Sequence, residues 1–504
     1  MNFTRRRFLH AGGVTALAAT TACDSIPEAL LIGRRVPARG EGPFQVPAGE
    51  STDLVSHALN RLTFGPRPGD YERVRKLGAD EDAAFAAFLD EQLNPSAIND
   101  PAAENALRRF ETLGEPPGEL FEYQEKLLLA ELTRGTLLRA VLSERQLYEV
   151  MVHFWSDHFN IDPSKGDCKW LKTADDRDVI RAHALGRFPE MLRASALSPA
   201  MLWYLDGRVN RRAKSADKPN ENYGRELLEL HTLGVHGGYS QKDVMEVARC
   251  LTGWTVRGTN QSKHSLGKVE FNPDQHDKDA KEVLGKIIPA IPVGVKREEA
   301  EILGRNELDQ VLEIVGLHPA TAKHLATKLC RRFIADEPPA AAVTKVADAF
   351  LRTRGDIGST LRALFATTEF RTTRANKFKR PFHFIVSALR ATDTATDAPP
   401  ALMDFLVRMG HAPFHYPTPD GYPEEATPWM GTLLWRWNFA VALTDGKING
   451  VKFENAALRK CFRGDDELFA HFLGRKPTAA ETDGGQASGA LVPLLLASPG
   501  FQKC

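Results

Sequence analysis

Apolar residues follow a helical spacing through most of the chain after Thr52, and this pattern constrains the fold more than any other feature. One segment also has a complete start signal, because Ser240 and Asp243 can form a capping box. We therefore predict a mainly α fold, built as a large multi-helix body. The expected helical segments are 71–77, 82–93, 101–113, 120–159, 222–233, 242–251, 305–315 and 319–333, with more helices to about 391 and from 433 to 500.

Two stretches interrupt the helical pattern. Residues 255–300 contain short runs with strand-like alternation, which predict a small β-hairpin or irregular lobe. Residues 410–430 contain five prolines, a spacing that no continuous helix tolerates. This second stretch is predicted to be an ordered loop, because it is also rich in aromatic residues.

The composition excludes several classes of protein. The 504 residues carry a net charge of zero, which gives no electrostatic footprint for nucleic acid. The chain has no G-x-S-x-G, H-E-x-x-H, Walker A or dinucleotide-binding motif. Its cysteines are far apart, which argues against a zinc ribbon. Cys250 and Cys330 lie on apolar helix faces and are expected to be buried thiols.

Residues 1–23 have the pattern of a twin-arginine export signal. Arg5 and Arg6 precede Phe8, a short apolar run follows, and the run ends at Cys23. Two outcomes remain open there: a loose lipobox predicts lipidation of Cys23, and the alternative is ordinary cleavage, for example after Ala18. Either outcome predicts an extracytoplasmic, periplasmic protein, and lipidation would tether it to a membrane. Residues 24–50, rich in Pro, Gly and charge, are expected to be a flexible linker.

The first candidate site is the helical segment around His153. Glu149, His153 and Asp157 are spaced four residues apart, so they share one helix face. Two carboxylates beside an imidazole suit a metal ion or an acid–base pair. His158 points to the opposite, apolar side. The alternative is a solvated helix face with one buried, hydrogen-bonded histidine.

The second and third candidate sites follow further along the chain. Arg225, Glu226 and Glu229 lie close together on a helical wheel, and His231 is on the other face. An ordinary amphipathic helix would have the same pattern, but Gly224 inside it predicts a packing requirement.

The third candidate is the loop 272–281, where imidazole and carboxylate donors cluster; a solvated charged turn is its alternative. The basic clusters 331–332 and 377–380 are interpreted as solvated faces, and Trp429, Trp435 and Trp437 as core side chains or a sugar or aromatic subsite.

Several motifs occurring in order resemble the bacterial family called domain of unknown function 1800. They are Asn60–Gly65, His153–Phe159, Asn220–Gly234, Gly238–Val244, Leu251–Trp254, His276–Lys281 and His318–Ala322. The resemblance runs from about residue 52 to 440 and implies a large, mostly helical exported protein. Residues 51–440 are therefore interpreted as the family domain and 441–504 as a C-terminal helical extension packed on it. Genes of this family often lie beside genes of a sulfatase-like exported family, which implies a possible partner protein.

These observations lead to one functional hypothesis and one alternative. The hypothesis is an extracytoplasmic enzyme, a hydrolase or an oxidoreductase, that depends on a cofactor or a divalent metal. The mixture of imidazole and carboxylate favours iron, manganese or zinc. Two helices would face each other across a polar cleft that the loop 272–281 closes. The alternative is a non-catalytic helical scaffold that works with the sulfatase-like partner. The predicted catalytic residues are Glu226, Glu229, Arg225 and His153, and the predicted metal ligands are His153, His158, His231, His276 and Asp277.

Overall fold

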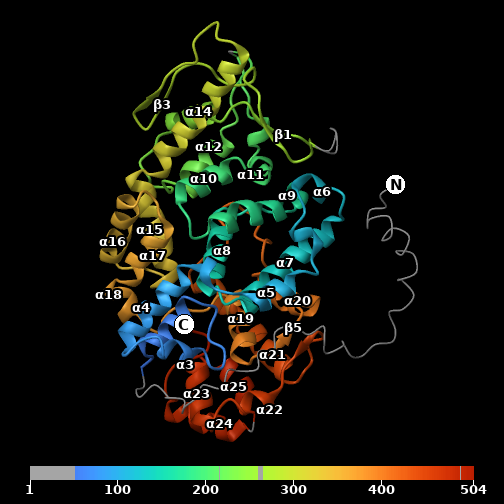
Figure 1. Ribbon diagram of the computed structural model, residues 1–504, viewed down its shortest axis with the longest axis vertical. Coiled ribbons are helices and arrows are strands. Elements are labelled where there is room, and N and C mark those ends of the chain that lie inside the picture. Colours follow the sequence, from blue (N-terminus) through green and yellow to red (C-terminus); the bar gives the residue numbers. More distant parts are fainter. Residues whose placement is uncertain (1–50, 215, 259–264, 489) are drawn as a thin grey trace, which may run out of the picture.

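Helices dominate the computed structural model, as the apolar spacing predicts (Figure 1). It describes residues 51–214, 216–258, 265–488 and 490–504. The predicted export signal at 1–23 and the predicted linker at 24–50 lie outside the described residues. Within these residues, no helix combines the length and the apolar character needed to cross a membrane.

Helices make up the regular structure of the described chain up to Cys250, apart from one isolated β-bridge between Arg187 and Asp356. The α-helices are α2 (Leu54–Arg61), α3 (Asp70–Arg75), α4 (Glu81–Gln92), α5 (Pro101–Leu107), α6 (Pro117–Leu120), α7 (Glu125–Leu142), α8 (Gln146–His158), α9 (Cys168–Asp175), α10 (Phe188–Ala196), α11 (Pro199–Tyr204), α12 (Asn222–Glu226) and α13 (Gln241–Cys250). Two π-helical turns continue α9 and α12, at Asp176–Arg181 and Leu227–His231.

Helices resume after a small β-containing lobe. They are α14 (Arg297–Gly316), α15 (Pro319–Phe333), α16 (Ala340–Arg352), α17 (Ile357–Phe365), α18 (Thr368–Thr372), α19 (Pro381–Ala391), α20 (Pro400–Arg408), α21 (Leu433–Thr444), α22 (Asn455–Arg459), α23 (Asp465–Leu473), α24 (Ala479–Ser488) and α25 (Leu491–Ala497). Between α20 and α21 the proline-rich stretch is a loop, as predicted, and it ends in the 3-10 turn η9 (Thr427–Thr432).

The small lobe predicted at 255–300 is present. Strand β1 (Trp254–Val256) pairs antiparallel with β2 (Val269–Phe271), and β3 (Lys281–Val283) pairs antiparallel with β4 (Lys286–Ile288). A third pair, β5 (Ala395–Thr396) with β6 (Val451–Lys452), was not predicted. Its strands are two residues long and distant in sequence, so local alternation could not indicate them.

The single helix predicted over 120–159 is divided in the structure. Ser143 has an extended backbone, with φ −63° and ψ 142°, and it ends α7. Its hydroxyl donates to Asp100 at 2.6 Å, and the same carboxylate accepts from the backbone N–H of Glu144 at 3.0 Å. Because a side chain from a distant segment holds the break, apolar spacing alone did not indicate it.

Helix α8 lies in the middle of the molecule. One end of the molecule contains α10 and α14, and the other end is formed by α21 to α25 (Figure 1). Its apolar side chains, Val150, Met151, Phe154 and Trp155, are buried in one continuous core. The C-terminal helices share that core, since the ring of Phe501 lies 6.1 Å from that of Phe384 on α19. The first candidate site is thus built on a helix that packing holds in place.

Candidate functional site

The face of α8 that carries Glu149, His153 and Asp157 meets two arginines. Arg181, from the π-helical turn after α9, donates twice to Glu149 at 3.0 and 3.1 Å. Arg380, at the start of α19, donates to Asp157 at 2.7 Å and to Nδ1 of His153 at 3.0 Å. A guanidinium only donates, so Nδ1 of His153 is an acceptor. Burial and the nearby Arg380 lower the pKa of His153 well below its usual value.

On the other side of α8, His158 is held through both ring nitrogens. Its Nε2 lies 3.1 Å from the carbonyl oxygen of His231, and Lys328 Nζ lies 3.1 Å from its Nδ1. Because a carbonyl oxygen only accepts, Nε2 carries the proton and Nδ1 accepts from Lys328. Burial, followed by the charge of Lys328, lowers the pKa of His158 well below its usual value. His158 is therefore a neutral imidazole, and it orients the amine of Lys328.

Lys328, on α15, projects into a cavity of about 270 Å³. Its walls are α8, α15 and the proline-rich loop, which contributes Asp420, Tyr422 and Glu424. Burial lowers the pKa of Lys328 to about 8, although Asp157, Glu424 and Asp420 oppose that change. Among the described residues, no carboxylate forms an ion pair with this amine. At pH 7.5 a group with this pKa is neutral in about a quarter of the molecules.

Glu424 borders the same cavity and is kept ionised. Its carboxylate lies 3.3 Å from Arg380 and 3.4 Å from Arg332, and all three side chains are buried. Burial opposes ionisation, but Arg380, Arg332 and Lys377 overcome it and lower the pKa of Glu424 to about 2. The sequence interpretation of 331–332 and 377–380 as solvated faces is wrong for Arg332, Lys377 and Arg380. These three side chains are buried, and carboxylates from distant segments pair with them.

The proline-rich loop is seated directly on α8 at Gly421. This residue has φ +74°, and a Cβ built on it would lie 2.0 Å from the carbonyl oxygen of Asp157. No other residue type fits such a close approach of two backbones. The contact positions Tyr422 and Glu424 over Asp157, and it forms one wall of the cavity.

Replacing Gly421 with Ala is expected to destabilise the fold by about 3 kcal/mol or more, because the methyl group would push the loop away from α8. Urea unfolding measures this loss. Gly410→Ala is the matched control: it also has a positive φ, of +71°, but nothing lies within 4 Å of its Cβ position. The control should lose only about 1 kcal/mol from backbone strain. Equal losses in the two variants would contradict the close seating of the loop.

The segment 222–231 meets α8 at this cavity through its C-terminal end. Leu230 lines the cavity, its carbonyl oxygen lies 3.3 Å from Nε2 of His324, and the His231 ring centroid lies 6.2 Å from that of His158. His231 is buried on a π-helical turn, and neither of its ring nitrogens has a hydrogen-bond partner among the described residues. Burial lowers its pKa to about 3.

The charged residues at the start of this segment are largely engaged with one another. Arg225 donates to Glu221 at 2.8 Å and to Glu229 at 3.4 Å. Glu226 forms no ion pair among the described residues, and burial, then Glu229 and the cavity residue Asp420, raise its pKa. Of the predicted catalytic residues here, only Glu226 is left with a free carboxyl.

His276 and Asp277 belong to a different part of the molecule. Nδ1 of His276 lies 2.9 Å from the carbonyl oxygen of Thr252, and Nε2 lies 3.1 Å from Glu307. Asp277 accepts from Arg249 at 2.6 Å and from Arg212. Burial raises the pKa of Asp277, but these two arginines lower it to about 2. Neither residue lines the Lys328 cavity, so the loop 272–281 does not close this site.

The predicted metal ligands are therefore distributed over separate sites, and most are engaged. His158 uses both nitrogens, His153 uses Nδ1, and His276 and Asp277 bind their own partners. Among the residues that the structure describes, no group of three or more His, Cys, Asp or Glu side chains could hold a metal ion. These side chains do not fit a shared metal site.

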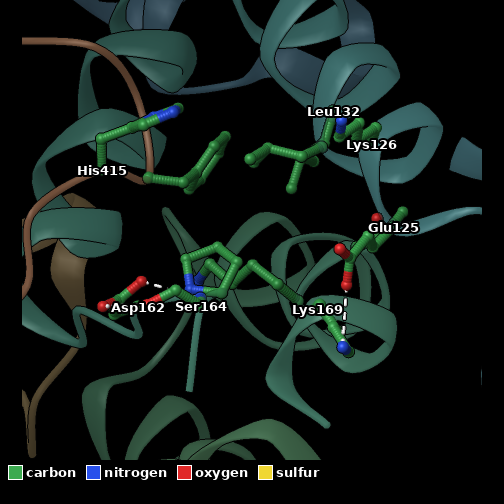
Figure 2. A pocket seen from close by; sticks show the side chains of 12 residues that line it. Glu125, Lys126, Leu132, Asp162, Ser164, Lys169 and His415 are labelled. Atoms are coloured by element: carbon green, nitrogen blue, oxygen red, sulfur yellow. Dashed lines mark hydrogen bonds and ion pairs between the residues drawn. The ribbon is translucent and has the colours of Figure 1, made fainter. Parts of the chain in front are cut away.

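A larger cavity, of about 550 Å³, lies between α7 and α9 (Figure 2). Its charged side chains are mostly paired: Lys169 lies 2.8 Å from Glu125, and Lys172 lies 2.7 Å from Asp175. Asp162 accepts from Ser164 at 2.7 Å, as Figure 2 shows. Lys126 and His415 also line this space. The smaller cavity differs because it holds a buried lysine amine that has no ion pair among the described residues, so the cavity at Lys328 is the candidate functional site.

The sequence analysis missed Lys328, Arg380 and Glu424. Lys328 follows His324 by four residues on α15, which places both on one helix face. That pairing was a usable signal, although it does not reveal His158 on the opposite wall. Arg380 and Glu424 had no local signal, because their partners come from distant segments.

Comparison with known proteins adds family membership and no activity. A family model described as "Protein of unknown function (DUF1800)" matches residues 57–503. The match includes residues 441–503, which the sequence analysis treated as an extension. Comparisons with curated proteins and with solved structures yield no match.

Proposed function

The chain belongs to this family of proteins of unknown function, and from the geometry of the Lys328 cavity we propose that it is an extracytoplasmic hydrolase of the acid–base type. Lys328 would act as a neutral amine and take a proton from a water molecule or from the substrate. The observation that carries the proposal is a lysine amine that donates to His158 inside a cavity and whose pKa is lowered to about 8.

Each neighbour of Lys328 supports a distinct part of this role. His158 orients the amine, because its Nε2–H is committed to the carbonyl oxygen of His231. Asp157 and Asp420 favour the charged amine, so they would stabilise the ammonium ion that forms when Lys328 takes a proton. Glu226 does not itself line the cavity, but its raised pKa and its electrostatic interaction with the cavity residue Asp420 make it the candidate proton donor. A base that activates water is what hydrolysis requires, so hydrolase fits these side chains better than oxidoreductase.

The location in this proposal comes from the twin-arginine pattern at residues 5–8 and from Cys23. Cell fractionation with an antibody against the full chain tests it. Replacing Arg5 and Arg6 with Lys should retain the protein in the cytoplasm, since such signals depend on the arginine pair.

Competitive labelling of lysines tests the chemical core of the proposal. With an amine-selective acylating reagent at pH 7, Lys328 should react about tenfold or more faster than Lys323, which is exposed on the same helix, because far more of Lys328 is neutral at that pH. Peptide mass spectrometry gives the rate at each site. The labelling rate of Lys328 should depend on pH with a midpoint near pH 8. His158→Ala should change this midpoint, because it removes the partner that orients the amine.

Turnover is the second readout. If the protein hydrolyses a chromogenic phosphate, sulfate or carboxylate ester, the rate of that hydrolysis should fall by about 10²-fold or more in Lys328→Met. The matched variant Lys323→Met should retain it. A Lys328 that labels no faster than Lys323 would remove the basis for a catalytic amine.

A non-catalytic scaffold is the second candidate, and one observation favours it. Many of the charged groups expected at the site are consumed in ion pairs, including Glu149 with Arg181 and Asp277 with Arg249. In that case the partner would be the sulfatase-like exported protein that the family resemblance implies. Normal labelling of Lys328, together with co-purification of that partner, would support the scaffold.

A further inference from the structure

Five large apolar side chains are exposed along the solvent side of α21 and the 3-10 turn before it. They are between 41% and 64% exposed. At 100° per residue the four of them on α21 lie within about 100° on a helical wheel, so they form one stripe, and the fifth lies in the turn that leads into this helix. We call this stripe the apolar face of α21; it consists of Met430, Leu433, Leu434, Trp437 and Val441.

The inner side of the same helix is firmly packed. Arg436, Phe439 and Leu443 are buried, and Arg436 donates to the carbonyl oxygen of Lys379 at 2.8 Å. On the outer side, the indole N–H of Trp437 donates to the carbonyl oxygen of Ala497 at 3.3 Å and so lies along α25. Because the helix is held from inside, the apolar face is a permanent feature of the surface and needs a partner of its own.

The start of the described chain lies in the same group of helices as this face. A Cβ built on Gly474, at the end of α23, would lie 3.4 Å from the side chain of Thr52. Helix α23 packs on α25, and α25 packs on α21. Figure 1 shows α21, α23 and α25 together at the lower end of the molecule. The described chain therefore begins in the group of helices to which α21 belongs.

The length and the sequence of that segment point to the partner. Lipidation of Cys23 is one of the two outcomes that the N-terminal pattern predicts, and residues 24–50 span at most about 90 Å when fully extended. A membrane that holds Cys23 is thus within reach of the helices to which the segment connects. Tryptophan and leucine side chains are the types that enter the interface between lipid headgroups and acyl chains.

We propose that the apolar face of α21 rests in the interface of a lipid bilayer, on the group of helices that the N-terminal segment joins. The proposal adds a contact surface to the proposed extracytoplasmic location, and it does not depend on catalysis by Lys328. Residues 1–50 would hold the protein near the bilayer, and α21 would orient it there. A single lipid chain gives only marginal binding, so a second contact of this kind is physically useful.

Tryptophan quenching by brominated lipids tests the contact. The full chain is added to vesicles of phosphatidylethanolamine and phosphatidylglycerol that carry bromine on the acyl chains, and quenching reports indoles that reach those chains. The wild-type protein should be quenched. Trp437→Phe should lose most of this quenching, because it removes the reporter and keeps an apolar side chain. Leu434→Asp should lose it as well, because a buried carboxylate prevents insertion.

The matched control is Ile302→Asp on α14, at the opposite end of the molecule, where Ile302 is 60% exposed. It should leave the quenching unchanged. Vesicle-bound wild-type protein without quenching would overturn the proposal. So would a dimer in sedimentation experiments that Leu434→Asp dissociates in the absence of lipid, since a second copy of the chain would then cover this face.

Discussion

Acidification from pH 6.5 to about pH 5 is expected to unfold the protein cooperatively. Seven buried histidines in the described structure have a lowered pKa, in every case first because of burial itself. They are His57, His153, His158, His231, His383, His411 and His471. Each must stay neutral in the folded chain, whereas in the unfolded chain each takes up a proton near pH 6.5.

The sign and the size of the effect follow from linkage. Below pH 6.5 the unfolded state binds more protons than the folded state, so stability falls as the pH falls. Each histidine lowers the free energy of unfolding by about 1 kcal/mol over the first pH unit below 6.5. Seven together lower it by about 7 kcal/mol, which is comparable to the whole stability of many domains. The lower limit of the pH window lies near pH 3 to 4, since the pKa of His57 and that of His231 are lowered to about 3 and that of His471 to about 4.

Urea unfolding at a series of pH values measures this dependence, with tryptophan fluorescence as the signal. His471→Gln should reduce the slope by about 1 kcal/mol per pH unit in this window, because it removes one titrating group. Glutamine can still donate to the carbonyl oxygen of Ala391, which lies 2.9 Å from Nε2 of His471. His236→Gln, at an exposed position, is the control and should preserve the slope. A stability that stays constant from pH 7 to 5 would show that these histidines are not held neutral.

Arg380→Met is expected to destabilise the protein by about 3–5 kcal/mol, the second-largest effect. The guanidinium is buried and lies 2.7 Å from Asp157 and 3.3 Å from Glu424. Methionine fills similar volume but leaves both carboxylates without this partner in a buried setting. Burial already raises the pKa of Asp157, and Arg380 is the first charge that opposes the change. In the variant, Asp157 should therefore also take up its proton at a higher pH than in the wild-type protein.

Thermal and urea unfolding give the loss, and a second arginine provides the comparison. Arg73 lies 2.9 Å from Glu91, but both side chains are exposed. Arg73→Met should cost less than about 1 kcal/mol, as exposed ion pairs do. Adding Asp157→Asn to Arg380→Met should recover part of the stability, because it removes one uncompensated charge. Similar losses for Arg380→Met and Arg73→Met would show that the buried pair contributes no more than a surface one.

Local sequence patterns were most reliable where the cause is local. The capping box at Ser240 and Asp243 starts α13 as predicted. Gly224 has the packing reason expected of it, because a Cβ there would lie 3.0 Å from the backbone of α13 at Val244 and Ala248. Cys250 and Cys330 are buried as predicted. The two π-helical turns were not predicted, and one of them carries His231.

The sequence by itself determined the helical class, the small lobe at 255–300 and the proline-rich loop, because spacing, capping and missing backbone donors act over a few residues. Only the tertiary structure decided which charged side chains are buried and paired. Lys328 is an ordinary helix cation in the sequence, and it becomes a candidate base because folding places His158 against it and a cavity around it. The pKa of a side chain depends on solvent and on charges within a few ångströms, and residues far apart in the sequence supply both here.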